Sequence, residues 1–157
     1  RGYSCMPLLA LAGWILIAFL AALIGGLAGP DSWYSGLTKP AWNPPNWVFG
    51  PVWTFLYTAM GVAAGLVWLR RGATPVQTAL TLFGVQLALN ALWSWLFFRW
   101  HRPGLAFAEL ALMWVAIVAT MVAFWRVRPL AGWLLAPYLA WVTFAGVLNF
   151  ALWRLNR

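Results

Sequence analysis

The stretch Trp33–Trp53, WYSGLTKPAWNPPNWVFGPVW, separates the first two apolar segments of the chain. It contains four prolines and four tryptophans, and the prolines at positions 40, 44 and 45 exclude regular helix and central strand from residues 39–45. Tryptophan combines an apolar ring with one N–H group and therefore suits the boundary between lipid and water. The stretch predicts a stiff aromatic loop over residues 29–46, which we call the lid, at one membrane face.

The composition indicates that lipid, rather than water, surrounds most of the chain. Of the 157 residues, 64% are hydrophobic and 8% are charged, whereas soluble domains carry about 25% charged residues. A net charge of +8 is typical of nucleic-acid-binding proteins. Most of the basic residues, however, stand at the ends of apolar runs, where they anchor helices at lipid headgroups. We therefore expect membrane lipid as a partner and no nucleic acid. These residues are Arg70, Arg71, Arg99, Arg102, Arg126, Arg128, Arg154 and Arg157.

Five apolar runs of about 20 residues match the length that a bilayer core demands. They predict an all-α integral membrane protein, in which residues 1–157 form a single domain built as a bundle of five transmembrane helices. Thr74 is predicted to cap the third helix and Pro75 to begin it. Pro137 lies inside the fifth span and predicts a kink there. The spans cover residues 7–28, 47–69, 75–98, 103–125 and 129–153.

Pairs of small residues at helix-contact spacing predict close approach between backbones. The pairs are Gly25 with Gly29, Gly61 with Gly65, and Gly84 with Ala88. They favour packing inside one bundle, and a homodimer seam is the alternative, with Gly84–Ala88 as its first candidate. The basic residues divide five against five between the two membrane sides, so the positive-inside rule assigns no orientation.

Cys5 is the one cysteine and His101 the one histidine, so we expect no disulfide framework and no metal site. His101 lies beside Arg99 and Arg102, which favours a turn residue at headgroup level over a ligand role. Tryptophans at span ends are typical of a boundary belt. Five others lie deeper, where each indole N–H requires a partner from protein or ligand: Trp53, Trp93, Trp95, Trp114 and Trp141.

The polar residues within the spans share a depth. Asn90, Glu109 and Asn149 all lie in the half of their spans nearest the lid. Trp53 and Trp93 belong to the same layer. This arrangement predicts a cavity with aromatic walls beneath the lid, suited to a flat, largely apolar ligand. The alternative is that these side chains simply fill the bundle core. Glu109 is a functional candidate by default, with protonation, a hydrogen bond to a neighbouring helix, or snorkelling as structural alternatives.

Conventional acid–base catalysis is not supported by the sequence. It contains no Ser-His-Asp set, no carboxylate pair and no phosphate-binding glycine loop. Tryptophan can, however, take part in light-driven redox chemistry when a photosensitising porphyrin is bound, an activity that comes from the ligand. Whether the protein is an enzyme stays open at this point.

The sequence resembles the translocator protein family, also called tryptophan-rich sensory proteins or peripheral-type benzodiazepine receptors. The similar pieces cover all five spans, and the pattern in the lid is highly specific. They are WY-x-x-L-x-KP-x-W-x-PP at 33–45, VFGPVWTFLY at 48–57, LNALWSWLFF at 89–98, PYLAW at 137–141 and LNFALWRLN at 148–156.

The resemblance implies a membrane receptor or sensor that binds tetrapyrroles such as protoporphyrin IX and haem, and also sterols or benzodiazepine-type ligands. No cofactor is required, since the porphyrin is the ligand, and a homodimer is implied. Alternatives are a light-dependent porphyrin-degrading enzyme, in which Trp53 and Trp141 act, or a tetrapyrrole or sterol transporter. The implied ligand-binding residues are Tyr34, Pro44, Trp53, Tyr57, Asn90, Trp93, Ser94, Trp141 and Ala145, with Asn90 as the main polar contact.

Two further points follow from the resemblance. The family's sterol motif in the last span requires a tyrosine, but Phe150 stands in its place between Leu148 and Arg154, so tetrapyrrole ranks above sterol. The membrane is implied to be the bacterial cell membrane, or the mitochondrial outer membrane if the protein is eukaryotic.

Overall fold

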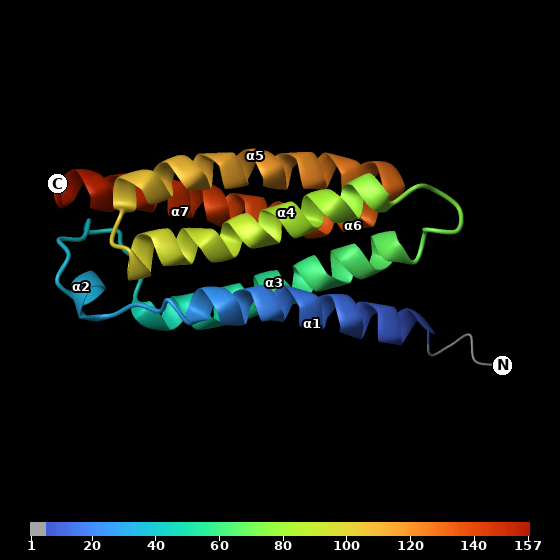
Figure 1. Ribbon diagram of the computed structural model, residues 1–157, viewed down its shortest axis with the longest axis horizontal. Helices are drawn as coiled ribbons and strands as arrows, with labels where there is room; N and C mark the ends of the chain where they lie inside the picture. Colours follow the sequence, from blue (N-terminus) through green and yellow to red (C-terminus); the bar gives the residue numbers. More distant parts are fainter. Residues whose placement is uncertain (1–5) are drawn as a thin grey trace.

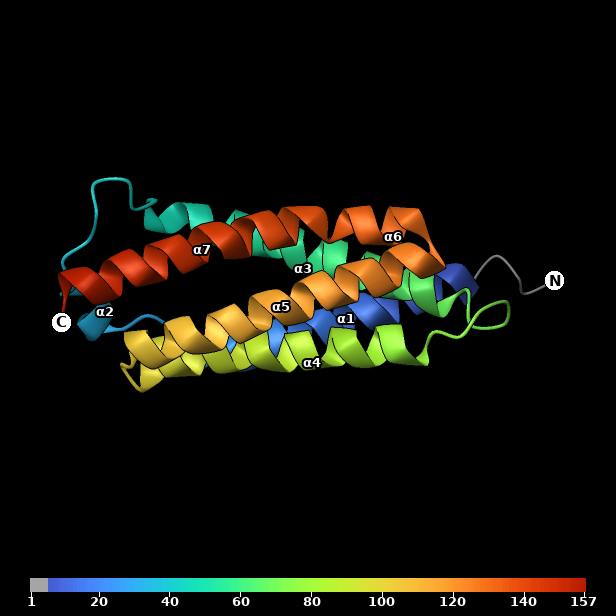
Figure 2. The same cartoon turned by 90° about the horizontal axis from the view of Figure 1, so that it is seen from above.

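The structure of the chain, a computed structural model, describes residues 6–157. Its helices form an antiparallel bundle in which the loop between the first two long helices and the C-terminus lie at the same end (Figures 1 and 2). The elements are α1 (Met6–Gly26), α2 (Ser32–Ser35), α3 (Asn46–Trp68), α4 (Gln77–Ser94), the π-helical turn η2 (Trp95–Arg99), α5 (Pro103–Val127), α6 (Pro129–Leu134) and α7 (Ala136–Leu155).

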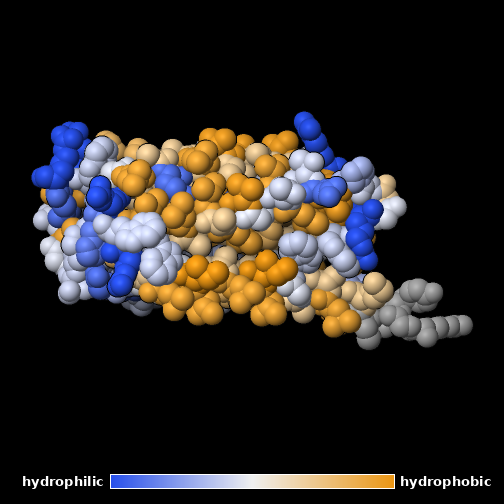
Figure 3. All heavy atoms as spheres, in the orientation of Figure 1, coloured by the Kyte–Doolittle hydropathy of each residue, from blue (hydrophilic) through white to orange (hydrophobic). Residues whose placement is uncertain are grey.

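The predicted five-span membrane fold is confirmed. Among residues 6–157, five helical segments are long and apolar enough to cross a bilayer; in two of them helices join end to end, η2 continuing α4 and α7 following α6. Apolar side chains cover most of the visible middle of the molecule, while hydrophilic residues gather at its two ends (Figure 3). This distribution is what a bilayer around the middle requires. Cys5, the cysteine for which no disulfide was expected, lies outside the described residues.

The predicted start of the third span is wrong by two residues. Gln77 begins α4, and its N-cap is Val76, which makes no side-chain capping bond. The backbone N–H of Thr74 instead donates to the carbonyl oxygen of Arg70 at 3.0 Å. Thr74 therefore belongs to the turn that ends α3, and Pro75 lies in the connection rather than in the first helical turn.

The predicted interruption at Pro137 is confirmed and divides the last span. The helix stops at Leu134 and restarts at Ala136, with Leu135 between the two pieces. Proline cannot donate a backbone hydrogen bond, and its ring crowds the preceding turn. The chain can therefore change direction between α6 and α7 without breaking either helix.

Small residues bring α1 and α3 into close contact, as predicted for Gly61 and Gly65. A Cβ atom on Gly61 would collide with the backbone of Ile15, and one on Gly65 would lie 2.6 Å from a methyl group of Leu11. The pairing of Gly25 with Gly29 is wrong in part: Gly25 packs near Ser94, but Gly29 lies beyond the end of α1 at a positive φ of 36°.

Gly84 and Ala88, the residues of the predicted homodimer seam, lie on the outer face of α4. A Cβ atom on Gly84 would meet nothing within 4 Å, and Ala88, one turn further along α4, is also exposed. These two residues are therefore free of contacts inside the bundle. The homodimer seam at Gly84–Ala88 stays a prediction.

The bundle is packed tightly at the end away from the lid. There α6 lies against both α3 and α5, and the rings of Phe83 and Phe124 stack at 5.7 Å with no exposed surface. Toward the lid, α7 continues along α5 but makes few contacts with α3. The two helices thus separate toward the lid, and the interior widens in that half.

Replacing Gly61 with valine should lower the stability of the bundle. The added side chain would force α1 away from α3, and overpacking of this kind costs about 1–3 kcal/mol. Thermal unfolding of the purified protein in detergent is the measurement, and Gly13→Val, at an open glycine of α1 where an added Cβ meets nothing within 4 Å, is the matched control. Equal melting temperatures for the two variants would show that the α1–α3 contact does not limit stability.

Candidate functional site

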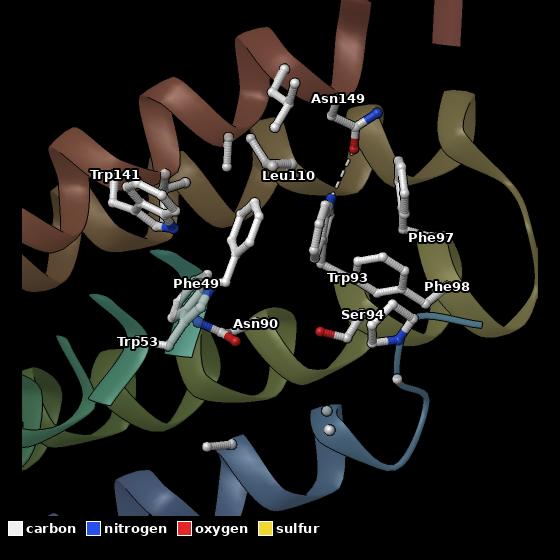
Figure 4. A pocket seen from close by; sticks show the side chains of 18 of the residues that line it. Phe49, Trp53, Asn90, Trp93, Ser94, Phe97, Phe98, Leu110, Trp141 and Asn149 are labelled. Carbon is white, nitrogen blue, oxygen red and sulfur yellow. Dashed lines mark hydrogen bonds between the residues drawn. The ribbon is translucent and has the colours of Figure 1, made fainter. Parts of the chain in front are cut away.

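A cavity of about 470 Å³ occupies the wide half of the bundle beneath the lid. Its walls come from α1, α3, α4, η2, α5 and α7, and the lid closes one end (Figure 4). Pro44 is not among the residues that line this space, although the resemblance implied it. The structure brings together the other eight implied residues: Tyr34, Trp53, Tyr57, Asn90, Trp93, Ser94, Trp141 and Ala145.

One wall of the cavity is aromatic and joins α3 to α7. The ring of Trp141 makes edge contacts with Phe49 at 5.9 Å and with Trp53 at 6.4 Å. Trp53 in turn lies 5.5 Å from the ring of Tyr57, one turn deeper in α3. Phe49 was not predicted as a site residue, although its place one turn before Trp53 puts both on one helix face.

The opposite wall is a stack of rings held by a hydrogen bond. Trp93 and Phe97 lie nearly parallel with their centres 5.3 Å apart. The indole Nε1 of Trp93 donates to Oδ1 of Asn149 at 2.9 Å (Figure 4). Asn149 also donates from Nδ2 to the carbonyl oxygen of Pro103 at 2.8 Å, which ties α4, α5 and α7 together. The orientation of the Trp93 ring is therefore fixed before any ligand binds.

A buried chain of hydrogen bonds lies at the inner end of the cavity. Tyr57 donates to Oδ1 of Asn90 at 2.7 Å, and Nδ2 of Asn90 donates to the hydroxyl of Tyr138 at 2.8 Å. Tyr138 then donates to Oε1 of Gln86 at 2.6 Å. All four side chains are buried, so each bond shields polar groups that would be costly to leave unpaired.

These hydrogen bonds change the role expected for Asn90. Both of its polar atoms are already bonded to protein, leaving one N–H and one lone pair for a ligand. The hydroxyl of Tyr138, as a partner of Asn90, and Gln86, as the acceptor for Tyr138, were missed. The four-residue spacing of Gln86 and Asn90 within an apolar helix was a signal that could have found them.

Within the part of the chain that the structure describes, residues 6–157, no charged side chain lines the cavity. Glu109, the acid inside the fourth span, is not part of it. Both carboxylate oxygens of Glu109 are buried, and neither has a hydrogen-bond partner among residues 6–157. The structure therefore excludes the two alternatives in which Glu109 snorkels to the boundary or bonds to a neighbouring helix.

Of the five deep tryptophans, two reach partners outside the cavity. Trp95 donates to the carbonyl oxygen of Ile24 at 2.9 Å, and Trp114 donates to the hydroxyl of Thr143 at 2.9 Å. With Trp93 bonded to Asn149, these contacts satisfy three of the five indoles. Trp53 and Trp141 remain, and both line the cavity.

The lid is more structured than the sequence predicted, because it contains the short helix α2. Asp31 caps this helix by accepting a hydrogen bond from the backbone N–H of Trp33 at 3.0 Å. Tyr34, in α2, is buried and closes the cavity from above. The ammonium group of Lys39 donates to the carbonyl oxygen of Tyr34 at 2.9 Å and lies 4.7 Å from its ring centre.

Besides ring contacts with η2 and α7, polar groups at the bundle end hold the lid. Asn156, at the end of α7, accepts from the backbone N–H of Thr38 and donates to its carbonyl oxygen, both at 2.8 Å. His101 stacks on Trp33 with ring centres 4.3 Å apart, and its Nε2 lies 3.4 Å from Oδ2 of Asp31. His101 is indeed a turn residue, as predicted, but it also contacts the lid.

The amino-acid sequence was compared with known proteins. The model of the TspO/MBR family matches residues 12–154. The chain belongs to the TspO/MBR family.

Similarity to individual members extends over most of the chain. The human translocator protein is 48% identical over 126 residues, which are 79% of this chain and 75% of that protein. The tryptophan-rich sensory protein of Cereibacter sphaeroides is 44% identical over 149 residues, 91% of this chain and 92% of that protein. The protein CrtK of Rhodobacter capsulatus is 40% identical over 152 residues, 96% and 95% of the two chains.

In this TspO/MBR family member, two side chains of the lid, Tyr34 and Asp31, have pKa values that differ from the usual values of these groups. Burial raises the pKa of the Tyr34 phenol, and the nearby Asn43 offsets this only in part. Desolvation acts to raise the pKa of Asp31, but the contact with His101 and the backbone N–H groups of α2 outweigh it and leave the pKa below its usual range. Asp31 therefore stabilises the lid while it is ionised, and this contribution is lost as pH falls below about 4.

Replacing Asp31 with alanine should loosen the lid at neutral pH, because α2 loses its cap and His101 loses its carboxylate neighbour. Amide hydrogen exchange in residues 32–38 should become about three- to tenfold faster, and the unaltered protein should approach this rate as pH falls below about 4, after correction for intrinsic exchange. Ser32→Ala, in the same helix, is the control. Unchanged protection in Asp31→Ala would show that Asp31 does not hold the lid.

Proposed function

We propose that this TspO/MBR family member is a membrane receptor or sensor that binds a planar tetrapyrrole, such as protoporphyrin IX or haem, in the cavity beneath the lid. The observation that carries the proposal is a preformed cavity between two aromatic walls, with Trp53 and Trp141 on one side and Trp93 and Phe97 on the other. Flat apolar rings gain stacking and burial between such walls.

The size and charge of the cavity support the same ligand class. Its volume of about 470 Å³ lies within the range of small-molecule sites, about 300–1,000 Å³. The neutral lining favours an apolar ring system, while an unpaired buried carboxylate would be costly. We therefore expect the acidic groups of a porphyrin to lie toward the lid, where the chain carries Lys39 and other polar groups.

Sterols and benzodiazepine-type ligands rank below tetrapyrroles. Phe150, which replaces the tyrosine of the sterol motif, is exposed on the outer side of α7, with the Arg154 guanidinium 5.9 Å from its ring. It offers no hydroxyl to a sterol. We further propose a homodimer with its seam at Gly84 and Ala88. The bacterial relatives favour the cell membrane as the location.

Filling the cavity should weaken the binding of protoporphyrin IX. Ala145→Phe places a ring where the ligand would lie, so its affinity should fall at least about tenfold, the equivalent of losing roughly 1.4 kcal/mol. Quenching of tryptophan fluorescence during a porphyrin titration measures this. Ala108→Phe, at an exposed position of α5, is the control. No quenching of the unaltered protein at saturating porphyrin would reject the proposed function.

A second function is favoured by the contact between Trp53 and Trp141. Their rings lie 6.4 Å apart and both line the cavity, so both would adjoin a bound porphyrin. At contact distance an adjacent indole can donate one electron to the photoexcited porphyrin, and dissolved dioxygen is the oxidant that degradation of the ring would consume. We propose light-dependent porphyrin degradation as an activity that accompanies binding, with the ligand as photosensitiser.

Under illumination the unaltered protein should consume protoporphyrin IX, and Trp53→Phe or Trp141→Phe should slow this loss several-fold. Absorbance of the porphyrin over time is the measurement, with a dark sample in parallel. Trp114→Phe is the matched control, because Trp114 is a deep tryptophan bonded to Thr143 outside the cavity. Equal rates in all four proteins would exclude a photochemical role for the cavity indoles.

A further inference from the structure

A second hollow, on the outer surface of the bundle, adjoins the cavity. It is a shallow groove along the seam between α3 and α7, and we call it the seam groove. Every residue that lines it is apolar or aromatic. From α3 these are Pro51, Val52, Phe55 and Leu56, and from α7 they are Pro137, Ala140, Trp141 and Phe144.

The seam groove and the cavity share one residue, Trp141. On the cavity side its indole contacts Phe49 and Trp53, and toward the groove it lies 5.4 Å from the ring of Phe144. One side chain thus forms the partition between the binding cavity and the bilayer. Because α3 and α7 make few contacts with each other here, little else closes the seam.

We propose that the seam groove is a lateral entrance, through which a planar apolar ligand dissolved in the acyl-chain region of the bilayer passes Trp141 into the cavity. The proposal rests on the proposed function, since it requires that the cavity bind such a ligand. The occupant is argued from the surface itself: the groove faces lipid, as the 59% exposure of Phe55 shows, and it leads to the cavity wall.

The helices allow this seam to open. Pro137 lies in the groove, two residues beyond Leu135, where α6 ends and α7 is about to begin. The piece α6 is held against α3 and α5 at the far end. A small change of angle at the junction would therefore give Trp141, one turn further along α7, room to rotate, while the hydrogen bonds of Asn149 and Asn156 hold the rest of α7 in place.

The alternative entrance, through the lid, is harder to open. Lifting the lid breaks the two hydrogen bonds between Thr38 and Asn156 and the contacts of His101 with Trp33 and Asp31. Rotating Trp141 out of the seam separates its ring only from the rings of Phe49, Trp53 and Phe144, and the entering ligand replaces those contacts. An apolar route also spares the ligand a passage through the polar headgroup layer.

Narrowing the entrance should change the rates of binding without changing affinity. A gate that is not part of the bound state alters association and dissociation equally, so their ratio, the Kd, is preserved. Ala140→Trp fills the seam groove from its exposed side. We expect it to slow both rates of protoporphyrin IX about tenfold, equivalent to a barrier about 1.4 kcal/mol higher, with Kd unchanged within about twofold.

Porphyrin emission followed by stopped flow in liposomes that contain the protein gives both rates. Ala108→Trp, the same substitution on exposed α5, is the control and should match the unaltered protein. Phe55→Ala, on the α3 side of the groove, should widen the entrance and accelerate both rates, which covers the case that Ala140→Trp does not fold. Asn156→Ala, which frees the lid, should leave both rates within about twofold.

The outcomes separate the two proposals. Rates that do not respond to Ala140→Trp or Phe55→Ala, or that respond only to Asn156→Ala, would overturn the lateral entrance while leaving the binding function intact. A change of Kd without the matched change of rates would also overturn it, because Ala140 would then act on the bound state. Failure of the unaltered protein to bind protoporphyrin IX would reject the function and the entrance together.

Discussion

Four hydrogen-bonded side chains at the middle of the bundle separate its packed half from its hollow half. Tyr57, Asn90, Tyr138 and Gln86 come from α3, α4 and α7, and their hydroxyl and amide groups satisfy one another. In a bilayer no water is present to replace such a bond, so moving any of these helices leaves a buried polar group unpaired. These hydrogen bonds therefore set the spacing of α3, α4 and α7 at the depth where the cavity begins.

On the two sides of these hydrogen-bonded residues, the same helices pack differently. Away from the lid, α6 lies against α3 and the interior is filled by rings such as Phe83 and Phe124. Toward the lid, α7 separates from α3, and large side chains line a space rather than fill it. The interruption at Pro137 makes both arrangements possible, because it allows one span to pack closely at one end and diverge at the other.

The lid completes the site by a different kind of contact. Its attachments to Asn156 and His101 are polar and lie at the bundle end, whereas the seam between α3 and α7 is closed by the ring of Trp141. The lid end is thus closed by hydrogen bonds together with ring contacts, whereas among residues 6–157 the seam is closed by ring contacts alone. An apolar molecule can replace the ring contacts of the seam, but it cannot replace the hydrogen bonds of the lid.

Much of the site was predictable because a bilayer restricts the answer. Long apolar runs in a membrane protein of this kind form helices, and the prolines exclude regular helix from residues 39–45. The shared depth of Trp53, Trp93, Asn90 and Asn149 followed from counting residues along each helix. The start of α4 was predicted two residues too early, because a threonine followed by a proline is as typical of a loop as of the first turn of a helix. The helix α2 was missed because four residues carry no periodic signal.

By itself, then, the sequence determined the class of protein, the number of spans, the lid and the layer in which the site lies. Each of these depends on local composition or on distance along one helix. Only the tertiary structure decided that Asn90 is bonded to Tyr57 and Tyr138, that Pro44 lies outside the cavity lining, and that Trp141 separates the cavity from an outer groove. These facts depend on the rotation and divergence of neighbouring helices, which apolar surfaces of similar composition do not encode.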